Sequence, residues 1–259
     1  MSIVSIITPS YNSAPFISDT VGSVLRQSLY DWEMIIVDDC STDGSVELID
    51  SFVAQDSRIK LIQLSENSGA AVARNTAIEA AQGRYIAFLD SDDIWLPNKL
   101  ETQLQFMQER DIAFSYSAYE KIDEQGQPLG LMGVPDKVNY DQLLKCCVIG
   151  CLTAIYDTHK LGKVYMPTNT KREDFGTWLQ ILKKVDYAYG INVVQAHYRV
   201  YATQSSAKKS KMALENWRLY RDVEQLNLLK ASYYFSNYAV RGVLRTKFPS
   251  LARKLHILD

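Results

Sequence analysis

Tyr85-Ile-Ala-Phe-Leu-Asp-Ser-Asp-Asp93 is the stretch that decides the fold. Its first five residues form an apolar run with aromatic and β-branched members, which is typical of a buried strand. Asp90, Asp92 and Asp93 follow directly, at the place where a parallel sheet opens onto solvent and ligand. Asp90 and Asp92 would point the same way on a continuing strand, so they repel each other unless a cation joins them. Hard oxygen ligands suit Mn²⁺ or Mg²⁺, and we favour a metal here over a simple turn that caps the next helix.

Before and after this stretch, the first part of the chain alternates between strand and helix patterns. The expected strands are 4–8, 33–37, 59–64 and 85–89, and the expected helices are 17–25, 46–53, 69–81 and one that begins at Pro97. Such alternation predicts a parallel sheet with right-handed crossovers, which binds ligands at the carboxyl ends of its strands. Three polar loops, 9–13, 38–44 and 90–93, should therefore meet at one edge.

The pattern is less regular beyond Ile112. We expect a strand at 113–118, a Gly/Pro turn at 125–133, a buried segment at 148–156, a helix at 175–183, a strand at 193–200, and one or two helices within 212–247. No internal repeat or low-complexity linker divides the chain. The simplest organisation is one α/β domain over 1–205, followed by a helical tail over 206–259.

Composition bounds the class of protein. The chain has 259 residues, of which 47% are hydrophobic, as expected for a globular protein with a substantial core. No run approaches the ~20 apolar residues of a membrane helix, and the N-terminus lacks a basic leader, so we expect a cytoplasmic protein. The four cysteines lack paired spacing and there are only three histidines, so we expect buried free thiols and no zinc site.

Charge is divided unevenly along the chain. The formal total is −2, but residues 199–259 hold 12 Lys and Arg against 4 Asp and Glu. The tail mixes these cations with tryptophan and tyrosine, a composition that suits an anionic membrane surface. A packing helix with a solvated basic face, or an oligomer contact, remains an equal alternative. We expect no nucleic-acid partner.

Several familiar catalytic motifs are absent. The sequence has no GxxxxGK[ST] loop, no GxGxxG after the first strand, no HExxH and no GxSxG, which removes the main support for P-loop, dinucleotide-binding, zincin and hydrolase functions. What remains is a set of acids and amides on loops. The candidate chemistry is therefore that of carboxylates, with a cation at 90–93.

Three charged groups outside the opening stretch each have two interpretations. Asp38-Asp39 either caps the next helix or joins the carboxylate cluster at the sheet edge. Arg74 is either solvated or lies beside a diphosphate, which its planar fork suits. Glu173-Asp174 either complements a helix dipole or supplies a base, whose pKa an apolar setting would raise.

Five motifs occur in a fixed order along the chain. They are SIITPSYN at 5–12, VDDCSTDGS at 37–45, NSGAAVARN at 67–75, GRYIAFLDSDD at 83–93 and ED at 173–174. This succession resembles glycosyltransferase family 2 over roughly residues 3–200. The resemblance implies the GT-A fold, a Rossmann-like and mostly parallel sheet flanked by helices. It further implies a nucleotide-binding half over 1–110, an acceptor-binding half over 111–205 and a C-terminal helical extension.

The resemblance also implies an activity. Family members invert the anomeric centre of a nucleotide-diphosphate sugar, usually with Mn²⁺ or Mg²⁺, and UDP-hexose is the commonest donor. The acceptor would be a hydroxyl of a saccharide or an undecaprenyl-linked saccharide in bacterial surface polysaccharide synthesis, with the enzyme on the inner face of the plasma membrane. A nucleotidyltransferase is the first alternative, but its loop after the first strand would need Gly and Lys, and 9–14 has neither. A non-catalytic carbohydrate-binding relative is the second, which the intact acids of all three loops disfavour.

Site residues carry over by position. The donor would contact Pro9, Tyr11, Asp39, Arg74, Asp90 and Arg199. Asp92, with Asp90 beside it, would bind the metal, and Asp174 would be the catalytic base, with Glu173 next to it. A Tyr-Arg segment followed by serines closes the donor site in bacterial members, and Tyr198-Arg199 with Ser205-Ser206 resembles it. His197 is a further candidate metal ligand, unless its strand merely buries or solvates it.

Overall fold

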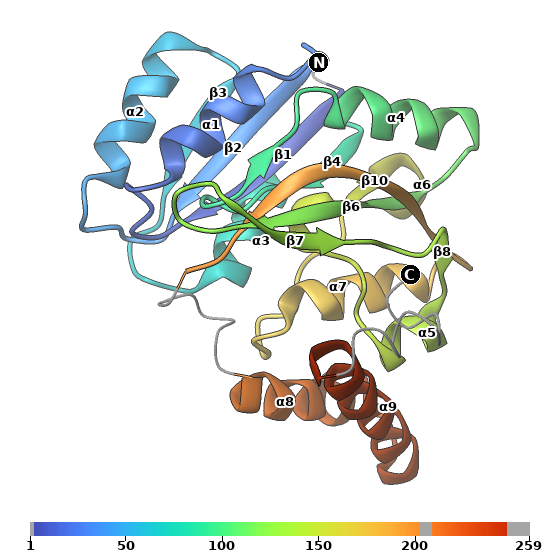
Figure 1. Cartoon of the computed structure of the whole chain (residues 1–259). Coiled ribbons are helices and arrows are strands. Elements are labelled where there is room, and N and C mark those ends of the chain that lie inside the picture. The colour runs from blue at the N-terminus through green and yellow to red at the C-terminus, as the bar shows by residue number, and fades with distance from the viewer. Residues whose placement is uncertain (1–2, 202–208, 248–259) are drawn as a thin grey trace.

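The first half of the chain alternates strand and helix, as predicted (Figure 1). The computed structural model describes residues 3–201 and 209–247. The elements are β1 (Val4–Ser10), α1 (Ile17–Leu25), β2 (Trp32–Asp38), α2 (Ser45–Gln55), β3 (Ile59–Gln63), α3 (Ala70–Ala80) and β4 (Tyr85–Phe88). Strand β1 pairs in parallel with β2 and β4, and β2 pairs in parallel with β3. The carboxyl ends of these strands therefore share one edge.

The second half extends the same sheet with strands of both directions. Its elements are β5 (Ile94–Trp95), α4 (Lys99–Glu109), β6 (Phe114–Ile122), β7 (Pro128–Met132), β8 (Lys137–Val138), α5 (Tyr140–Lys145), the 3-10 turn η1 (Cys151–Thr153), β9 (Ile155–Asp157), α6 (Thr158–Leu161), α7 (Glu173–Leu182) and β10 (Ala188–Arg199). The strand order is β3-β2-β1-β4-β9-β6-β10-β5, with β7 on β6 and β8 on β10. One continuous sheet thus joins the strands of residues 4–88 to those of residues 94–199.

The predicted turn at 125–133 is wrong in extent. Residues Pro128–Met132 form β7, which pairs antiparallel with β6. The reversal is confined to the residues just before it, where the Asp123 carboxylate accepts hydrogen bonds from the backbone of Gln125 and Gln127. The hydrogen bonds along β6 keep this Gly- and Pro-containing segment extended, a tertiary effect that local composition does not report.

Two apolar cores lie on opposite faces of the sheet. Strand β2 is buried throughout, and its alternate residues face the two sides. Ile35 and Val37 join α3 and α7 in one core, whereas Met34 and Ile36 join α1, α2 and α4 in the other. This three-layer arrangement fixes the helices and so fixes the loops at the carboxyl edge.

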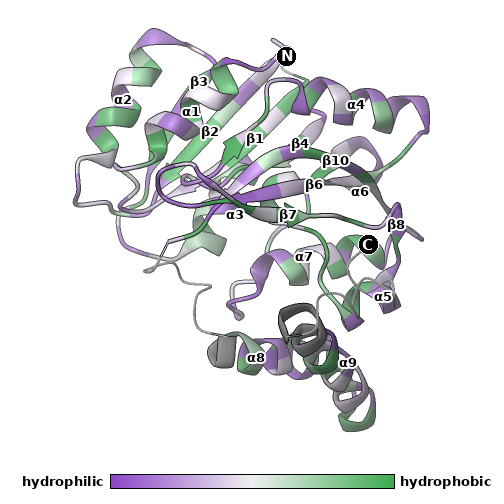
Figure 2. Ribbon diagram, viewed as in Figure 1, coloured by the Kyte–Doolittle hydropathy of each residue, from purple (hydrophilic) through white to green (hydrophobic). Residues whose placement is uncertain are grey.

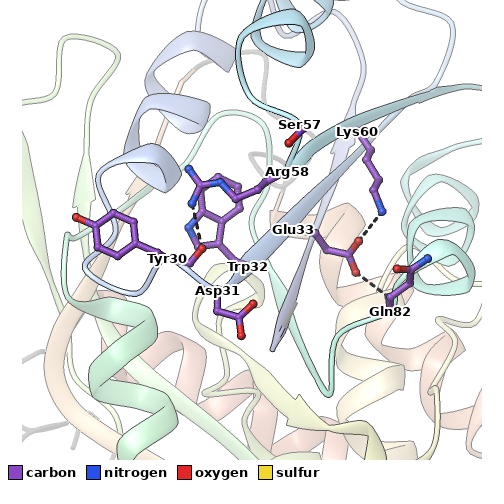
Figure 3. A pocket seen from close by; sticks show the side chains of 8 residues that line it. All are labelled: Tyr30, Asp31, Trp32, Glu33, Ser57, Arg58, Lys60 and Gln82. Atoms are coloured by element: carbon purple, nitrogen blue, oxygen red, sulfur yellow. Dashed lines mark hydrogen bonds and ion pairs between the residues drawn. The ribbon is translucent and has the colours of Figure 1, made fainter. Parts of the chain in front are cut away.

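Glu33 ties the opposite end of the sheet together (Figure 3). Its buried carboxylate accepts hydrogen bonds from Ser5 Oγ (2.6 Å), Lys60 Nζ (2.7 Å) and the backbone N–H of Gln82 (2.7 Å). Burial alone would raise the pKa of Glu33, but these hydrogen bonds outweigh it and lower the pKa below 4.5. The charged form is therefore the stabilising one.

We predict that Glu33→Gln lowers the free energy of unfolding at pH 7 by about 1.5–3 kcal/mol, the usual worth of hydrogen bonds to a charged group. Because the pKa is lower in the folded chain, this contribution is present above the unfolded-state pKa and is lost as pH falls through the folded-state value. Urea unfolding of both proteins should show a difference that shrinks below about pH 4. A difference that stays constant down to acid pH would contradict the assignment.

The tail is docked against the second half rather than separate from it. It consists of α8 (Lys209–Arg218), the π-helical turn η3 (Leu219–Val223) and α9 (Leu228–Lys247). Tyr220 donates its hydroxyl to the carbonyl of Leu144 (2.6 Å), and Tyr234 donates to Asp141 Oδ1 (2.6 Å). The predicted tail residues 206–208 and 248–259 lie outside the described residues. Across 3–201 and 209–247, no helix has the length and apolarity needed to cross a membrane.

Candidate active site

Hydrogen bonds join the first two polar loops at the carboxyl edge. The backbone N–H of Asn12 donates to Ser41 Oγ (2.9 Å), and Asn12 Oδ1 accepts from the N–H of Thr42 (2.8 Å). Tyr11, next to Asn12, leaves 54% of its side chain exposed, and Pro9 is half-buried. The loops that carry Pro9, Tyr11 and Asp39 therefore meet as predicted, and their contact with a nucleobase stays a prediction.

Asp39 holds the third segment of the site in place. Its buried carboxylate accepts hydrogen bonds from the backbone N–H groups of Ser68 (2.6 Å) and Gly69 (2.7 Å). Gly69 has φ +89°, a conformation that favours glycine, and α3 begins directly after it. This contact explains the helix start of the NSGAAVARN motif, because it sets the entry angle of the helix that carries Arg74.

Arg74 joins two parts of the chain that lie far apart in sequence. Its side chain is only 8% exposed and pairs with Asp90 Oδ1 (2.6 Å), just after β4, and with Glu173 Oε1 (3.2 Å), the first residue of α7. Burial would lower the pKa of Arg74, but the two carboxylates raise it, so the guanidinium stays charged. The ion pairs therefore hold the start of α7 close to residues 90–93, which we call the acid loop.

The next residue of α3 strengthens the same connection. Asn75 donates from Nδ2 to the carbonyl of Met166 (2.9 Å) and accepts from the N–H of Met166 (2.7 Å), just upstream of α7. Arg74 and Asn75 therefore hold both the start of α7 and the segment that leads to it. The start of α7, with Glu173 and the predicted base Asp174, therefore lies at the carboxyl edge of the parallel strands. We call this edge, where Asp90, Asp92 and Asp93 follow β4, the acid edge.

Asp174 is the second residue of α7 and lies near the same cluster. Its Oδ1 accepts the backbone N–H of Phe175 (2.7 Å), and its charge acts on Cys147, Cys151 and Arg172. Desolvation raises the pKa of the Cys151 thiol, and the charges of Asp90, Asp174 and Glu173 add to the rise. Cys151 is therefore a neighbour of the site.

The burial of the cysteines differs in part from the prediction. All four thiols are free, as predicted. Only Cys146 is buried, whereas Cys40, Cys147 and Cys151 are half-buried, so the prediction of buried thiols is wrong for these three. The reason is position, because Cys147 and Cys151 lie on the segment that lines the site and Cys40 lies in its loop after β2.

Asp92 is held by an aromatic side chain from the end of the domain. Tyr201 donates its hydroxyl to Asp92 Oδ2 (2.9 Å), and the ring of Tyr201 lies 5.3 Å from that of Phe16. Burial, and then the charge of Asp90, raise the pKa of Asp92 to about 6. A carboxylate with a raised pKa beside a second carboxylate is one that a cation would stabilise.

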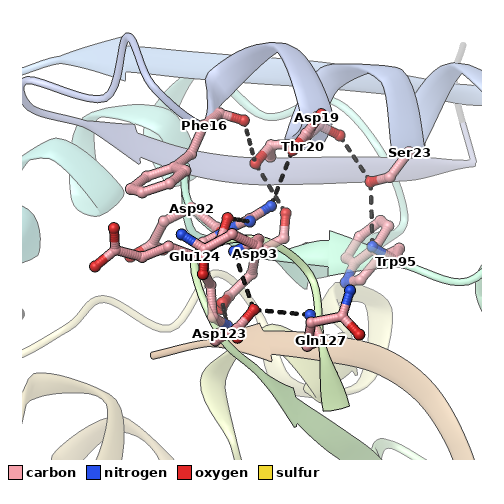
Figure 4. A network of polar contacts seen from close by, with 12 residues as sticks. Phe16, Asp19, Thr20, Ser23, Asp92, Asp93, Trp95, Asp123, Glu124 and Gln127 are labelled. Atoms are coloured by element: carbon pink, nitrogen blue, oxygen red, sulfur yellow. Dashed lines mark hydrogen bonds and ion pairs between the residues drawn. The ribbon is translucent and has the colours of Figure 1, made fainter. Parts of the chain in front are cut away.

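Asp93 and Arg199 support the acid loop. Figure 4 shows Asp92 and Asp93 next to Thr20 of α1. Asp93 is fully buried and accepts the backbone N–H of Arg199 (2.9 Å), and Thr20 donates to its carbonyl (2.8 Å). The Arg199 side chain donates to the carbonyls of Asp92 (3.0 Å) and Glu124 (2.8 Å). It also pairs with Asp19 Oδ2 (3.0 Å) and covers the Phe16 ring.

These contacts bear on the donor role predicted for Arg199. The guanidinium joins α1, the acid loop and the turn between β6 and β7. In this structure it holds the backbone carbonyl of Asp92. Donor contact by Arg199 stays a prediction, and Ser205-Ser206 lie outside the described residues.

The residues present fit a divalent ion that takes few protein ligands. Within the described parts of the chain, no group of three or more His, Cys, Asp or Glu side chains is placed to hold a metal ion. Mg²⁺ and related ions in nucleotide sites use one or two carboxylates and fill their coordination with phosphate and water oxygens. Asp92 and Asp90 match that requirement. His197 Nε2 instead lies 3.6 Å from Glu120 Oε2 on the neighbouring strand. Its role as a metal ligand stays a prediction.

Two surface pockets of the described chain lie away from the acid edge. One of about 330 Å³ lies at the opposite end of the strands, beside Glu33 (Figure 3). Its lining holds two acids, Asp31 and Glu33, and two cations, Arg58 and Lys60, so its formal charge is balanced. Geometry and electrostatics therefore favour the acid edge as the active site.

The strand order and the arrangement of the layers define a GT-A fold. Staphylococcus aureus TarS residues 1–349, solved in complex with UDP-GlcNAc, matches 95% of this chain and 73% of its own with a TM-score of 0.71 and 20% identity. Mannosyltransferase PcManGT from Pyrobaculum calidifontis, solved with GDP-Man and Mn²⁺, matches 98% of this chain and 79% of its own with a TM-score of 0.68 and 17% identity.

The chain belongs to glycosyl transferase family 2, whose model matches residues 5–146. It is 49% identical to the putative teichuronic acid biosynthesis glycosyltransferase TuaG of Bacillus subtilis, over 93% of this chain and 96% of the relative. It is 40% identical to the UDP-Glc:alpha-D-GlcNAc-diphosphoundecaprenol beta-1,3-glucosyltransferase WfgD of Escherichia coli, over 95% and 96% of the two chains. The resemblance inferred from five motifs is therefore confirmed at the level of family and fold.

Sequence reasoning missed Tyr201 and Cys151. Tyr201 follows β10, whose carboxyl end reaches the same edge as β4, so its place after the Tyr-Arg segment could have suggested contact with the acid loop. Cys151 lies in a turn of three residues, too short for any periodic signal.

Proposed function

We propose that this protein transfers a sugar from a nucleotide-diphosphate sugar, with a UDP-hexose as donor, to a hydroxyl of a lipid-linked saccharide, with inversion at the anomeric carbon. The observation that carries the proposal is the bridge from Arg74 to Asp90 and Glu173, which joins the acid loop to the start of α7. One side of this bridge suits a diphosphate and its cation, and the other offers a carboxylate to an acceptor. A transferase needs both within one site.

On the donor side, the chain supplies fixed charge and a lining. Pro9, Tyr11 and Asp39 are proposed to contact the nucleobase, and Asp90 to lie beside ribose. Mn²⁺ or Mg²⁺ held by Asp92 and Asp90 would neutralise the negative charge that builds on the leaving diphosphate. Arg74 is buried behind the acid loop and its ion pair holds the Asp90 carboxylate in place.

On the acceptor side, Asp174 is the proposed general base. Its carboxylate would accept the proton of the acceptor hydroxyl while the hydroxyl oxygen bonds to the anomeric carbon and the bond from that carbon to the diphosphate oxygen breaks. A single displacement of this kind inverts the anomeric configuration. Glu173 is engaged with Arg74, so we assign it the positioning of α7 rather than proton transfer.

The acceptor proposal draws on the relatives. WfgD and a second E. coli relative, WfaP, which is 38% identical, are both named for GlcNAc-diphosphoundecaprenol acceptors. An acceptor with an undecaprenyl chain would place this protein at the inner face of the plasma membrane. We propose that location, with the tail as the part that meets the membrane.

The test uses a panel of UDP-hexoses, an α-GlcNAc-diphospho-lipid acceptor and Mn²⁺. We expect release of UDP and a product whose new linkage is β by proton NMR when the donor is α. Release of pyrophosphate from a nucleoside triphosphate and a sugar phosphate would instead identify a nucleotidyltransferase. An α-linked product would overturn the inverting mechanism.

A further inference from the structure

Helix α9 has two faces of different character. Its inner face packs on the body through Ala231, Tyr234 and Phe235, and Phe235 lies edge-on to Trp217 with ring centroids 5.5 Å apart. Its outer side exposes four large apolar residues, Leu228 (61%), Leu229 (83%), Tyr233 (54%) and Val240 (58%). Figure 2 shows α9 at the periphery of the molecule, with hydrophobic segments along its length. The inner face is satisfied by packing, and the outer face is not.

The charge around this outer face is positive. Three acids of neighbouring elements are paired, because Asp141 binds Lys145 (2.5 Å), Glu224 binds Lys183 (2.7 Å) and Glu215 binds Arg218 (2.9 Å), while Asp222 of η3 is exposed. Lys230 is exposed on α9 itself, one residue after Leu229. In sequence, residues 199–259 hold 12 Lys and Arg against 4 Asp and Glu, so the segment that contains α9 has a positive formal charge.

We propose that the outer side of α9, formed by Leu228, Leu229, Tyr233 and Val240 with Lys230, docks on an anionic phospholipid bilayer. Exposed apolar side chains bordered by cations are the pattern of a helix that lies in the membrane interface, where its apolar face is buried and its cations meet lipid phosphates. A second copy of this chain would bring identical cations together, which repulsion disfavours. The proposal deepens the membrane location given above, although lipid binding itself requires no sugar transfer.

The attachment of the tail gives this docking a consequence for the site. Turn η3 lies against the first turn of α7, where the Tyr220 ring is 6.4 Å from that of Phe175 and a Cβ on Gly176 would lie 3.4 Å from Leu219. Phe175 follows the proposed base Asp174 directly. A bilayer bound to α9 would therefore hold the acceptor side of the site at a fixed orientation to the membrane.

The test is sedimentation of the full chain with vesicles of equimolar phosphatidylcholine and phosphatidylglycerol, and with vesicles of phosphatidylcholine alone. We expect the wild type to bind the anionic vesicles. The partition coefficient of the double variant Leu229→Asn with Val240→Asn should be lower by at least about tenfold. The matched control is Leu129→Asn with Leu131→Asn, which changes two exposed leucines of β7 and should bind like the wild type. Lys230→Gln should weaken binding to the anionic vesicles alone.

Three results would overturn the proposal. The first is absence of wild-type binding to anionic vesicles, and the second is an equal loss of vesicle binding in both double variants. The third is a wild-type dimer in light scattering that dissociates to monomers in the α9 variant alone. Far-UV circular dichroism checks that each variant is folded. Hydrolysis of the donor without a lipid acceptor should be unchanged in the α9 variant, so a failure of lipid binding is distinguishable from a failure of the proposed transferase.

Discussion

Asp174→Asn should lower the rate of sugar transfer roughly 10²–10⁴-fold, the range for losing a general base. The amide keeps the shape of the side chain and still accepts the hydrogen bond from the N–H of Phe175, so α7 should begin as it does now. It cannot take the proton of an acceptor hydroxyl. Binding of UDP should be unchanged, because Asp174 faces the acceptor in the proposed arrangement. Steady-state transfer assays combined with calorimetric titration of UDP separate the two effects.

The matched control is Asp186→Asn, the same change at an exposed residue beyond the far end of α7. It should leave transfer within about twofold of the wild type, as surface substitutions usually do. Wild-type turnover by Asp174→Asn would remove this residue from the mechanism. A parallel loss of UDP binding would reassign it to the donor side.

Arg74→Gln should both destabilise the protein and disable it. The substitution leaves Asp90 and Glu173 without their shared cation, at 26% and 18% side-chain exposure. Breaking a largely buried ion pair by removing one partner costs about 3 kcal/mol. Repulsion between the two carboxylates should also move α7 away from the acid loop, and we expect roughly a 10²-fold loss of transfer, the cost of a small misplacement.

Arg58→Gln provides the comparison for Arg74→Gln. Arg58 also pairs with a nearby carboxylate, that of Asp56, but at 32% and 19% exposure and at the opposite end of the sheet. Its loss should cost about 0–1 kcal/mol and leave transfer unchanged. Urea unfolding and transfer assays of both variants measure the effects. Equal effects on stability, or an active Arg74→Gln enzyme, would show that the bridge does not organise the site.

The first half of the fold was predictable because its strands contain apolar runs and its longer helices repeat apolar residues at helical spacing. Strand β2 holds the apolar run Met34 to Val37 and α1 repeats its apolar residues at helical spacing, so the parallel sheet and its acid edge followed directly. The meeting of loops 9–13, 38–44 and 90–93 followed in turn, since carboxyl ends of parallel strands share an edge. Family membership needed the ordered motifs in addition.

The second half was less predictable for physical reasons. Strand β5 has two residues and α6 has four, which is too short for periodicity, and β7 exists because β6 offers it a partner. The side-chain roles were harder still. Nothing local indicates that Arg74 spans to Glu173, or that Asp93 points into the interior, because both depend on contacts across about a hundred residues of chain.

The central claim is that the acid loop binds a nucleoside diphosphate through a divalent cation. Calorimetric titration of UDP into the wild-type protein with Mn²⁺, repeated with EDTA and with Asp92→Asn, tests it most directly. We expect saturable binding that EDTA abolishes and that Asp92→Asn weakens by at least about tenfold, the loss expected for one missing charged ligand. Equal affinity for UDP in all three titrations would contradict it.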